Sequence, residues 1–173
     1  MQVSIGESVM KAIAVTALLL LPGAAGAALP ADIASRILNA HNAARAEVRV
    51  APMRWDAGLA ADAEVWARHL AGLNRMEHWG THGEPANHEG ENLWMGTRQA
   101  FTVEQMVGSW ANEKIALRRM RRWEDDFHAV GHYTQMVWRG STAVGCAIVA
   151  NASYDFLVCR YAPQGNIVGQ NPF

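Results

Sequence analysis

The sequence has almost no net charge and few cysteines. Its 173 residues include 15 Lys and Arg against 16 Asp and Glu, a formal net charge of -1. This balance gives no electrostatic reason to expect nucleic acid or an anionic membrane as a partner. No internal repeat or low-complexity stretch is visible after residue 28, and no Ser stands in a Gly-x-Ser-x-Gly motif. The missing motif argues against a serine hydrolase of the nucleophile-elbow type.

Long apolar runs are missing from most of the chain. Residues 12–21 follow Lys11 as one apolar run, which is too short to anchor the chain stably in a bilayer. Pro22 and Gly23 interrupt it, and residues 25–27 are the small residues that signal peptidase requires. This order predicts an export signal that is cleaved after Ala27 or Ala28; the alternative is a buried N-terminal helix.

The predicted organisation is a signal peptide over residues 1–27 followed by one domain over residues 28–173. Glu7 is unusual ahead of a signal core, so Met10 is an alternative start to Met1. No later stretch is apolar enough to span a membrane. We therefore expect a secreted protein, extracellular or periplasmic, without a transmembrane segment after cleavage.

Half of the residues are apolar, which is enough material for one core. Three helices are predicted: residues 32–48, a second that begins at the N-cap Asp56, and a third that begins with a capping box at Thr102. Strand-like segments are predicted at residues 92–95, between the second and third helices, and at residues 144–149 and 156–161, after the third. This order, without regular alternation, favours an α+β layered domain.

The two cysteines are predicted to form a disulfide across a hairpin. Residues 144–149 and 156–161 are rich in strand-forming residues, and Asn151-Ala152-Ser153 lies between them. A turn centred between Ala152 and Ser153 places Cys146 directly opposite Cys159, at the separation that a disulfide needs. Closing this short loop contributes about 3 kcal/mol in the chain-entropy model. The alternative is a free thiol nucleophile.

Three side chains are candidates for chemistry, and each also has an ordinary explanation. Glu113 follows Trp110 by three residues, so it lies on the apolar stripe of the third helix, where a carboxylate needs a partner or must reach water. His132 stands in a segment dense in packing residues, where a histidine is more often part of the core than a ligand. Glu91 precedes a strand and could equally be a surface carboxylate.

Four motifs resemble those of the cysteine-rich secretory, antigen 5 and pathogenesis-related (CAP) family. They are GHYTQMVWRGS at residues 131–141, FLVCRYAPQGNI at 156–167, HNAAR at 41–45 and GENL at 90–93. The resemblance covers about residues 33 to 173, and four motifs in the right order make it very specific. It implies a three-layer α-β-α sandwich with a central cleft that is lined by two histidines and two glutamates.

The resemblance assigns these four side chains individually. His132 and Glu91 match through their own motifs, and Glu113 matches through the Trp-x-x-Glu pattern that begins at Trp110. The second histidine is assigned to His78. His82 and His88 are the alternatives, because the loop before the GENL motif is longer here.

Two imidazoles and two carboxylates suit a divalent metal such as zinc. The same four groups could instead form a hydrogen-bonded network in which a glutamate orients each histidine. A metal-dependent hydrolase or peptidase would use Glu91 or Glu113 as its base and a metal-bound water as its nucleophile. The two cysteines are assigned to the disulfide.

Trp79 and Trp94 flank the histidine-rich loop and could line a cleft for an apolar ligand. Lipid and sterol binding are implied by the resemblance. The first hypothesis is therefore an extracellular binding or defence-related module that takes a divalent metal, a lipid or a sterol. The second hypothesis is a metal-dependent hydrolase at the same four residues.

Overall fold

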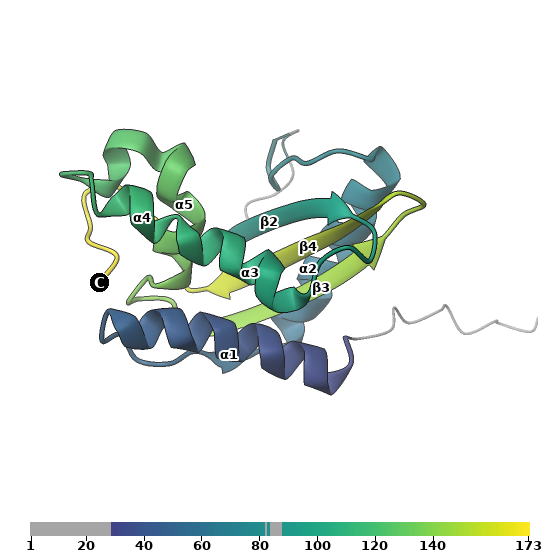
Figure 1. Ribbon diagram of the computed structural model, residues 1–173, viewed down its shortest axis with the longest axis horizontal. Helices are drawn as coiled ribbons and strands as arrows, with labels where there is room; N and C mark the ends of the chain where they lie inside the picture. The colour runs from purple at the N-terminus through teal and green to yellow at the C-terminus, as the bar shows by residue number, and fades with distance from the viewer. Residues whose placement is uncertain (1–28, 82, 84–87) are drawn as a thin grey trace, which may run out of the picture.

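The computed structural model describes residues 29–81, 83 and 88–173 (Figure 1). The predicted signal peptide, residues 1–27, lies outside the described residues. The elements run in the order α1 (Ala31–Glu47), β1 (Arg54–Trp55), α2 (Ala57–Leu73), β2 (Gly90–Thr97), α3 (Val103–Asn112), α4 (Lys114–Leu117), a 3-10 helix (Trp123–Asp126), α5 (Phe127–Met136), β3 (Ala143–Ala150) and β4 (Tyr154–Ala162).

A four-stranded mixed sheet lies between two helical layers, as Figure 1 shows. The strand order is β1-β3-β4-β2; β1 is parallel to β3, and the other two pairings are antiparallel. On one face α2 buries Trp66 and Leu70 against Phe156 of β4. On the other face α1, α3 and α5 share a second core around Trp110 and Leu157. The predicted α+β class with three α-β-α layers is confirmed.

The hairpin and its disulfide are confirmed in the predicted register. Ala150 lies opposite Asp155, and Cys146 lies opposite Cys159. The two cysteines are bonded, and their Cα atoms are 4.1 Å apart. Both side chains are buried in the core beneath α1 and α3, so the cross-link holds together the two central strands of the sheet.

The predicted caps of α2 and α3 are also confirmed. The Asp56 side chain accepts from the backbone N–H groups of Gly58 and Leu59 at the start of α2, at 2.9 and 3.2 Å. Thr102 and Gln105 form a reciprocal capping box at the start of α3. Each cap satisfies N–H groups that have no partner within the helix, and it therefore fixes the residue at which the helix begins.

The segment between α3 and β3 is more helical than predicted. Residues 114–130 read as a charged connection, but they contain α4, the 3-10 helix and the start of α5. Gly131, a poor helix former, lies in the middle of α5 and weakens its sequence signal. Packing explains this glycine, because a Cβ atom there would lie 2.9 Å from the ring of Phe127.

Arg45 joins α1 to the end of α5. Its guanidinium is buried and donates to the carbonyl oxygens of Met136 and Trp138, at 3.1 and 2.9 Å, and to those of Ala51 and Ser141. The carbonyls at the C-terminus of a helix carry partial negative charge, so a buried cation is favourable there. Arg45 therefore helps to fix the position of α5, which carries His132.

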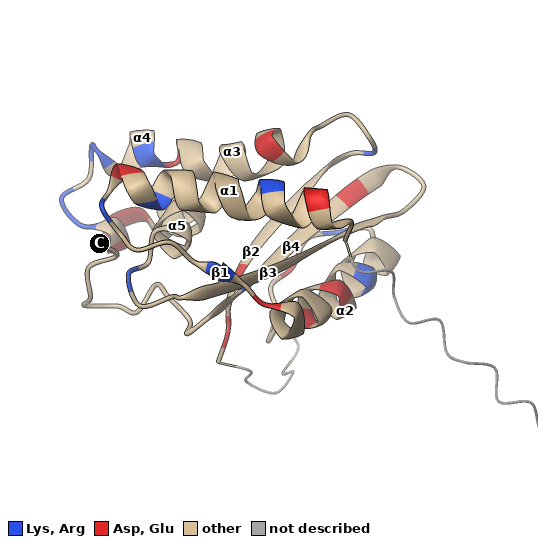
Figure 2. Ribbon diagram, turned by 90° about the horizontal axis from the view of Figure 1, so that it is seen from below, with Lys and Arg blue, Asp and Glu red and all other residues tan. Residues whose placement is uncertain are grey.

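Charged side chains of both signs are interspersed along the helices, as Figure 2 shows. Among the described helices, none has the length and apolar character needed to cross a membrane.

His41 is fully buried beside Arg45 and Tyr161. Its Nδ1–H donates to the carbonyl of Ile37 at 2.9 Å, and its Nε2 accepts from the Tyr161 hydroxyl at 2.8 Å. Burial lowers the pKa of His41 from 6.5 to about 4, because the charged imidazolium cannot be solvated in the core. His41 is therefore neutral in the folded protein over a range where it is charged in the unfolded chain.

We expect this difference to make stability depend on pH. Between pH 6.5 and about 4 the unfolded chain binds a proton at His41 that the folded protein does not bind. The free energy of unfolding should therefore fall as the pH is lowered through this window, by at most about 3 kcal/mol. Urea denaturation at about pH 7 and about pH 4.5 measures the change. A His41→Gln variant should be less stable throughout but should lose this part of the pH dependence, and an unchanged dependence would contradict the assignment.

Candidate functional site

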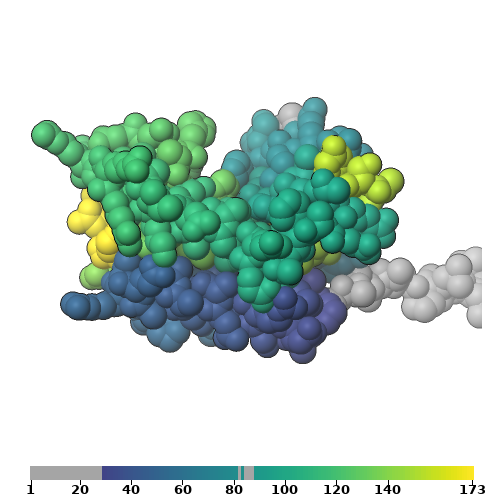
Figure 3. Space-filling view, in the orientation of Figure 1, coloured from purple at the N-terminus to yellow at the C-terminus, as the bar shows by residue number. Residues whose placement is uncertain are grey.

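Two adjoining cavities lie at the end of the sheet where β2 begins, between the loop after α2 and helix α5. The smaller holds about 70 Å³ and the larger about 300 Å³. They share His78, Glu91, Phe127 and Asn166 as lining residues, and we call the two together the cleft. In Figure 3 the surface is hollowed between the residues of α5 and those that follow α2.

The first of two histidine–glutamate pairs in the cleft joins α5 to the end of α3. His132 Nδ1 is 2.6 Å from Glu113 Oε1, and the other oxygen of this carboxylate accepts from the backbone N–H of Tyr133 at 2.9 Å. The imidazole also stacks on Trp110, at 5.9 Å between ring centroids and 15° between planes. Glu113 is the C-cap residue of α3, so its helix fixes the carboxylate that holds His132.

The second pair joins the loop after α2 to the start of β2. His78 Nδ1 is 2.6 Å from Glu91 Oε1, and the same oxygen accepts from the backbone N–H of Trp79 at 3.1 Å. Glu91 lies opposite Arg160 on the neighbouring strand β4. The guanidinium Nη2 of Arg160 lies 2.9 Å from Glu91 Oε2 as an ion pair.

The two pairs share one construction. In each, a carboxylate receives the Nδ1 of a histidine and the backbone N–H of the residue that follows this histidine. An ionised carboxylate only accepts hydrogen bonds, so Nδ1 must carry the ring proton. The lone pair of a neutral ring is then on Nε2, the nitrogen that can bind a metal or accept a hydrogen bond.

Arg160 organises the charge in the larger cavity. Its side chain is only 2% exposed, its guanidinium carbon lies 5.3 Å from the centre of the Trp79 ring, and Nη1 lies 3.7 Å from Glu89. Burial is the main cause that raises the pKa of Glu89, and the nearby Asp62 carboxylate adds to it. A buried cation therefore sits between two carboxylates and an aromatic ring at the floor of the cleft.

Three buried side-chain atoms lack a hydrogen-bond partner among the described residues: Glu91 Oε2, Arg160 Nε and Asn166 Oδ1. The Glu91 oxygen has its ion-pair contact with Arg160, but without hydrogen-bond geometry. All three residues line the cleft. Leaving such a group unpaired costs about 1–3 kcal/mol, so the wall of the cleft holds one buried donor and two buried acceptors that remain unsatisfied by the described residues.

The structure brings most of the predicted site residues together. His78, Glu91 and His132 line the smaller cavity. Glu113 does not line it but bonds to Nδ1 of His132. Trp79 lines the larger cavity. Trp94 lies elsewhere: its ring packs edge-on against Phe101, at 5.2 Å, on the α3 side of the sheet.

His82 and His88 are the alternatives to His78. His82 lies outside the described residues. His88 is exposed and has a positive φ of 56°. The His78 ring bonds to Glu91 through Nδ1.

The four predicted ligands do not all point toward one place where a metal ion could bind. Within the described part of the chain, no group of three or more His, Cys, Asp or Glu side chains could hold a metal ion. The reason is the orientation of the carboxylates, which are turned onto the Nδ1 atoms of the histidines instead of facing a common point. Of these four side chains, the two imidazoles are the ones that keep a ring nitrogen without a partner among the described residues.

Sequence reasoning missed Arg160, Asn166 and Gln135. Arg160 stands between Cys159 and Tyr161 in the buried part of β4, a position where a charged side chain needs a buried partner. The Gln135 side chain accepts from Gly165 N at 2.9 Å and donates to Ser141 Oγ at 3.0 Å, which holds the far wall of the cleft. All three lie within the GHYTQMVWRGS and FLVCRYAPQGNI motifs.

A protein-family model and curated relatives both match this sequence. The model of the cysteine-rich secretory protein family, CAP, matches residues 38–161. The chain is 39% identical to pathogenesis-related protein 1B of Nicotiana tabacum over 137 residues, which are 79% of this chain and 78% of the tobacco protein.

Solved structures share the fold. The crystal structure of NaASP2 with Zn2+ superposes with a TM-score of 0.68 at 23% identity, over 84% of this chain and 87% of that one. Na-ASP-1 superposes with a TM-score of 0.65 at 26% identity, over 82% of this chain and 41% of that one.

The buried ion pair gives a stability prediction. Glu91→Ala removes the nearest carboxylate from the buried Arg160, and we expect the free energy of unfolding to fall by about 3 kcal/mol. Glu91→Gln should cost less, because the amide oxygen can still accept. Urea denaturation measures both variants. The matched control is Glu104→Ala, which breaks the exposed pair with Arg36 and should cost no more than about 1 kcal/mol; an equally small effect of Glu91→Ala would refute the role of the buried pair.

Proposed function

The chain belongs to the cysteine-rich secretory protein (CAP) family, and from this premise we propose that it is an extracellular binding module whose cleft takes a polar ligand. The observation that carries the proposal is the pair of matching histidine–glutamate contacts. Each holds an imidazole by its Nδ1 and leaves Nε2 for a ligand, and the rest of the cleft wall is rich in amide and charged groups.

A divalent metal such as zinc is the first candidate for a bound ion. His78 and His132 would hold it through Nε2, and solvent or a bound ligand would complete its coordination. Glu91 and Glu113 would orient the two rings through Nδ1, because a histidine that binds a metal usually donates its other N–H to a carboxylate. A bound zinc supplies Lewis acidity. NaASP2, a protein of the same fold, has been solved with Zn2+, which supports testing this ion first.

A hydrolytic function finds less support in this geometry. A general base must be free to take a proton from water, but both carboxylates of the cleft are already engaged. Glu113 bonds to His132 and to the Tyr133 N–H, and Glu91 bonds to His78 and to the Trp79 N–H and pairs with Arg160. The ligand-binding proposal requires neither carboxylate to leave its partner.

The lining of the cleft favours a polar ligand over a lipid or sterol. Trp79 is held between Trp66 and Arg160, and Trp94 lies elsewhere. The described apolar group at the mouth is Phe127, which is 46% exposed. Lipid or sterol binding thus stays a prediction from the family resemblance.

The extracellular setting rests on the predicted export signal and on the disulfide, which forms and persists in oxidising compartments. The tobacco relative is named a pathogenesis-related protein. A defence-related role follows as the family-level proposal for this chain.

Zinc titration by calorimetry near neutral pH tests the ion site. We expect the wild type to bind one zinc and a His78→Ala, His132→Ala double variant to lose binding, because both nitrogens are removed. Glu91→Gln and Glu113→Gln should weaken binding by about 10–100-fold without abolishing it, as expected for groups that orient the ligands.

His82→Ala and His88→Ala are the matched controls and should bind zinc as the wild type does. Loss of binding in either would move the second histidine to that position. Absence of zinc binding by the wild type would refute the ion site and leave the cleft as a site for a metal-free polar ligand. Hydrolysis that requires the metal and is lost in Glu91→Gln would contradict the binding module.

A further inference from the structure

One edge of the central sheet is open for most of its length. Strand β3 has eight residues, but β1 pairs with only its first two, Ala143 and Val144. After Trp55 the chain turns away into α2, which begins at Ala57. From Gly145 to Ala150, no described strand lies beside β3 on the side opposite β4.

Two observations identify the backbone groups that face this open edge. Val144 C=O accepts from the N–H of Asp56 at 2.9 Å, so the backbone of Val144 points toward β1. The Cα atoms of Cys146 and Cys159 are 4.1 Å apart, which is the short spacing of a non-hydrogen-bonded antiparallel pair. By the alternation of the strand, the N–H and C=O groups of Cys146 and Ile148 also point away from β4.

No backbone hydrogen bond from the described residues reaches these groups of Cys146 and Ile148. An unpaired row of alternating N–H and C=O groups is a template for another extended chain. Most folded proteins cover or shorten such an edge, so an edge left open inside a sandwich calls for an occupant.

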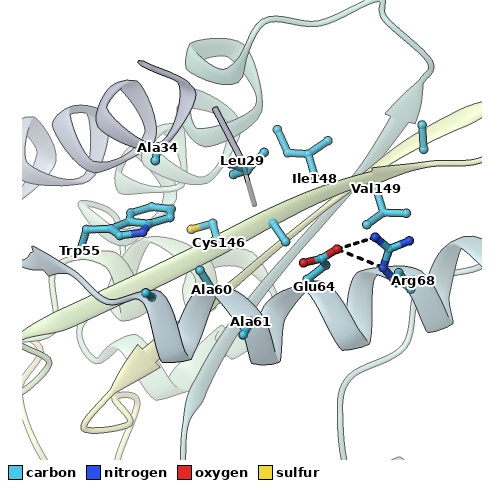
Figure 4. A pocket seen from close by; sticks show the side chains of 13 residues that line it. Leu29, Ala34, Trp55, Ala60, Ala61, Glu64, Arg68, Cys146, Ile148 and Val149 are labelled. Carbon is cyan, nitrogen blue, oxygen red and sulfur yellow. Dashed lines mark hydrogen bonds and ion pairs between the residues drawn. The ribbon is translucent and has the colours of Figure 1, made fainter. Parts of the chain in front are cut away.

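A cavity runs along this edge. It holds about 460 Å³ and is lined from both faces of β3, by Cys146 and Ile148 on one face and Ala147 and Val149 on the other. A cavity that touches both faces of a strand must lie beside its edge. Figure 4 shows it between the start of α1, with Leu29 and Ala34, and the α2 residues Ala60 and Ala61. We call this cavity the edge groove.

The edge groove deepens toward β1. Cys146 is 1% exposed and Ala147 6%, Ile148 and Val149 are half-buried, and Ala150 is exposed. The helical walls consist mainly of alanines, which leave room beside the strand. At the outer end Glu64 and Arg68 of α2 form an ion pair, drawn with dashed lines in Figure 4.

We propose that the edge groove is a strand-addition site, which binds an extended peptide segment of a partner protein beside β3. Backbone hydrogen bonds to Cys146 and Ile148 would supply affinity, and the alanine-lined walls would select small apolar side chains. This site is separate from the histidine cleft, which lies at the opposite edge of the sheet, at the start of β2.

The geometry favours a peptide over other occupants. Helices wall the groove on both sides, so it admits a single strand but not the helix-flanked sheet edge of a second copy. An acyl chain could fill the apolar walls but would leave the backbone groups of Cys146 and Ile148 without partners, at a cost that an extended peptide avoids.

The test selects peptides from a displayed library of random heptapeptides on the purified protein. Selected peptides are then titrated against ¹⁵N-labelled protein. We expect the amide protons of Cys146 and Ile148 to exchange quickly in the free protein and at least about tenfold more slowly in the complex, because they become hydrogen-bonded. The same peptides with N-methyl groups at alternate residues, which cannot pair with a strand edge, should bind at least about tenfold more weakly.

Ala60→Phe, at a half-buried position of the groove wall, should fill the groove and abolish peptide binding. The matched control is Val65→Phe on the same helix, because Val65 is 62% exposed and lies outside the groove; it should bind as the wild type does. The proposal is wrong if no peptide is selected, if Cys146 and Ile148 are already protected in the free protein, or if N-methylation has no effect. Binding of palmitate that slows neither amide, together with no peptide binding, would assign the groove to a lipid and would also overturn the proposal.

Discussion

The cleft depends on two largely buried carboxylates and on the hydrogen bonds that satisfy them. The side chains of Glu91 and Glu113 are only 8% and 19% exposed, and a charged group in such a place needs hydrogen bonds or a counterion. Each obtains a histidine Nδ1–H and a backbone N–H, and Glu91 also obtains Arg160. The requirement to satisfy these carboxylates therefore positions the loop after α2 and helix α5 against the sheet.

The sandwich holds these carboxylates at fixed points. Glu91 lies at the second position of β2, and the full-length pairing of β2 with β4 places it beside Arg160. Glu113 ends α3, whose beginning is fixed by the Thr102 capping box. Arg45 ties the end of α5 to α1. Rigid elements thus carry every group of the two pairs except His78, which lies on the loop after α2.

Local signals predicted the fold well, whereas the site needed tertiary contacts. The hairpin register followed from strand composition and turn length, and the caps of α2 and α3 followed from Asp56 and Thr102. Helix α5 was missed because Gly131 weakens its pattern; the Phe127 ring packs over this glycine. The sequence indicated which glutamates and histidines meet but not their orientation, because the contact of Nδ1 with each carboxylate depends on segments far apart in the chain. Arg160 was missed for the same reason: its partners come from β2 and the loop ahead of it.

The account rests on the claim that each carboxylate holds its histidine by Nδ1 and leaves Nε2 for a ligand. Long-range ¹H–¹⁵N correlation spectra of ¹⁵N-histidine-labelled protein, recorded at a pH where the imidazoles are neutral, measure this directly. The account predicts that His78 and His132 both carry the proton on Nδ1 and the lone pair on Nε2. A proton on Nε2 in either ring would contradict it, because that ring would then be held in the opposite sense and could not offer Nε2 to a metal or polar ligand.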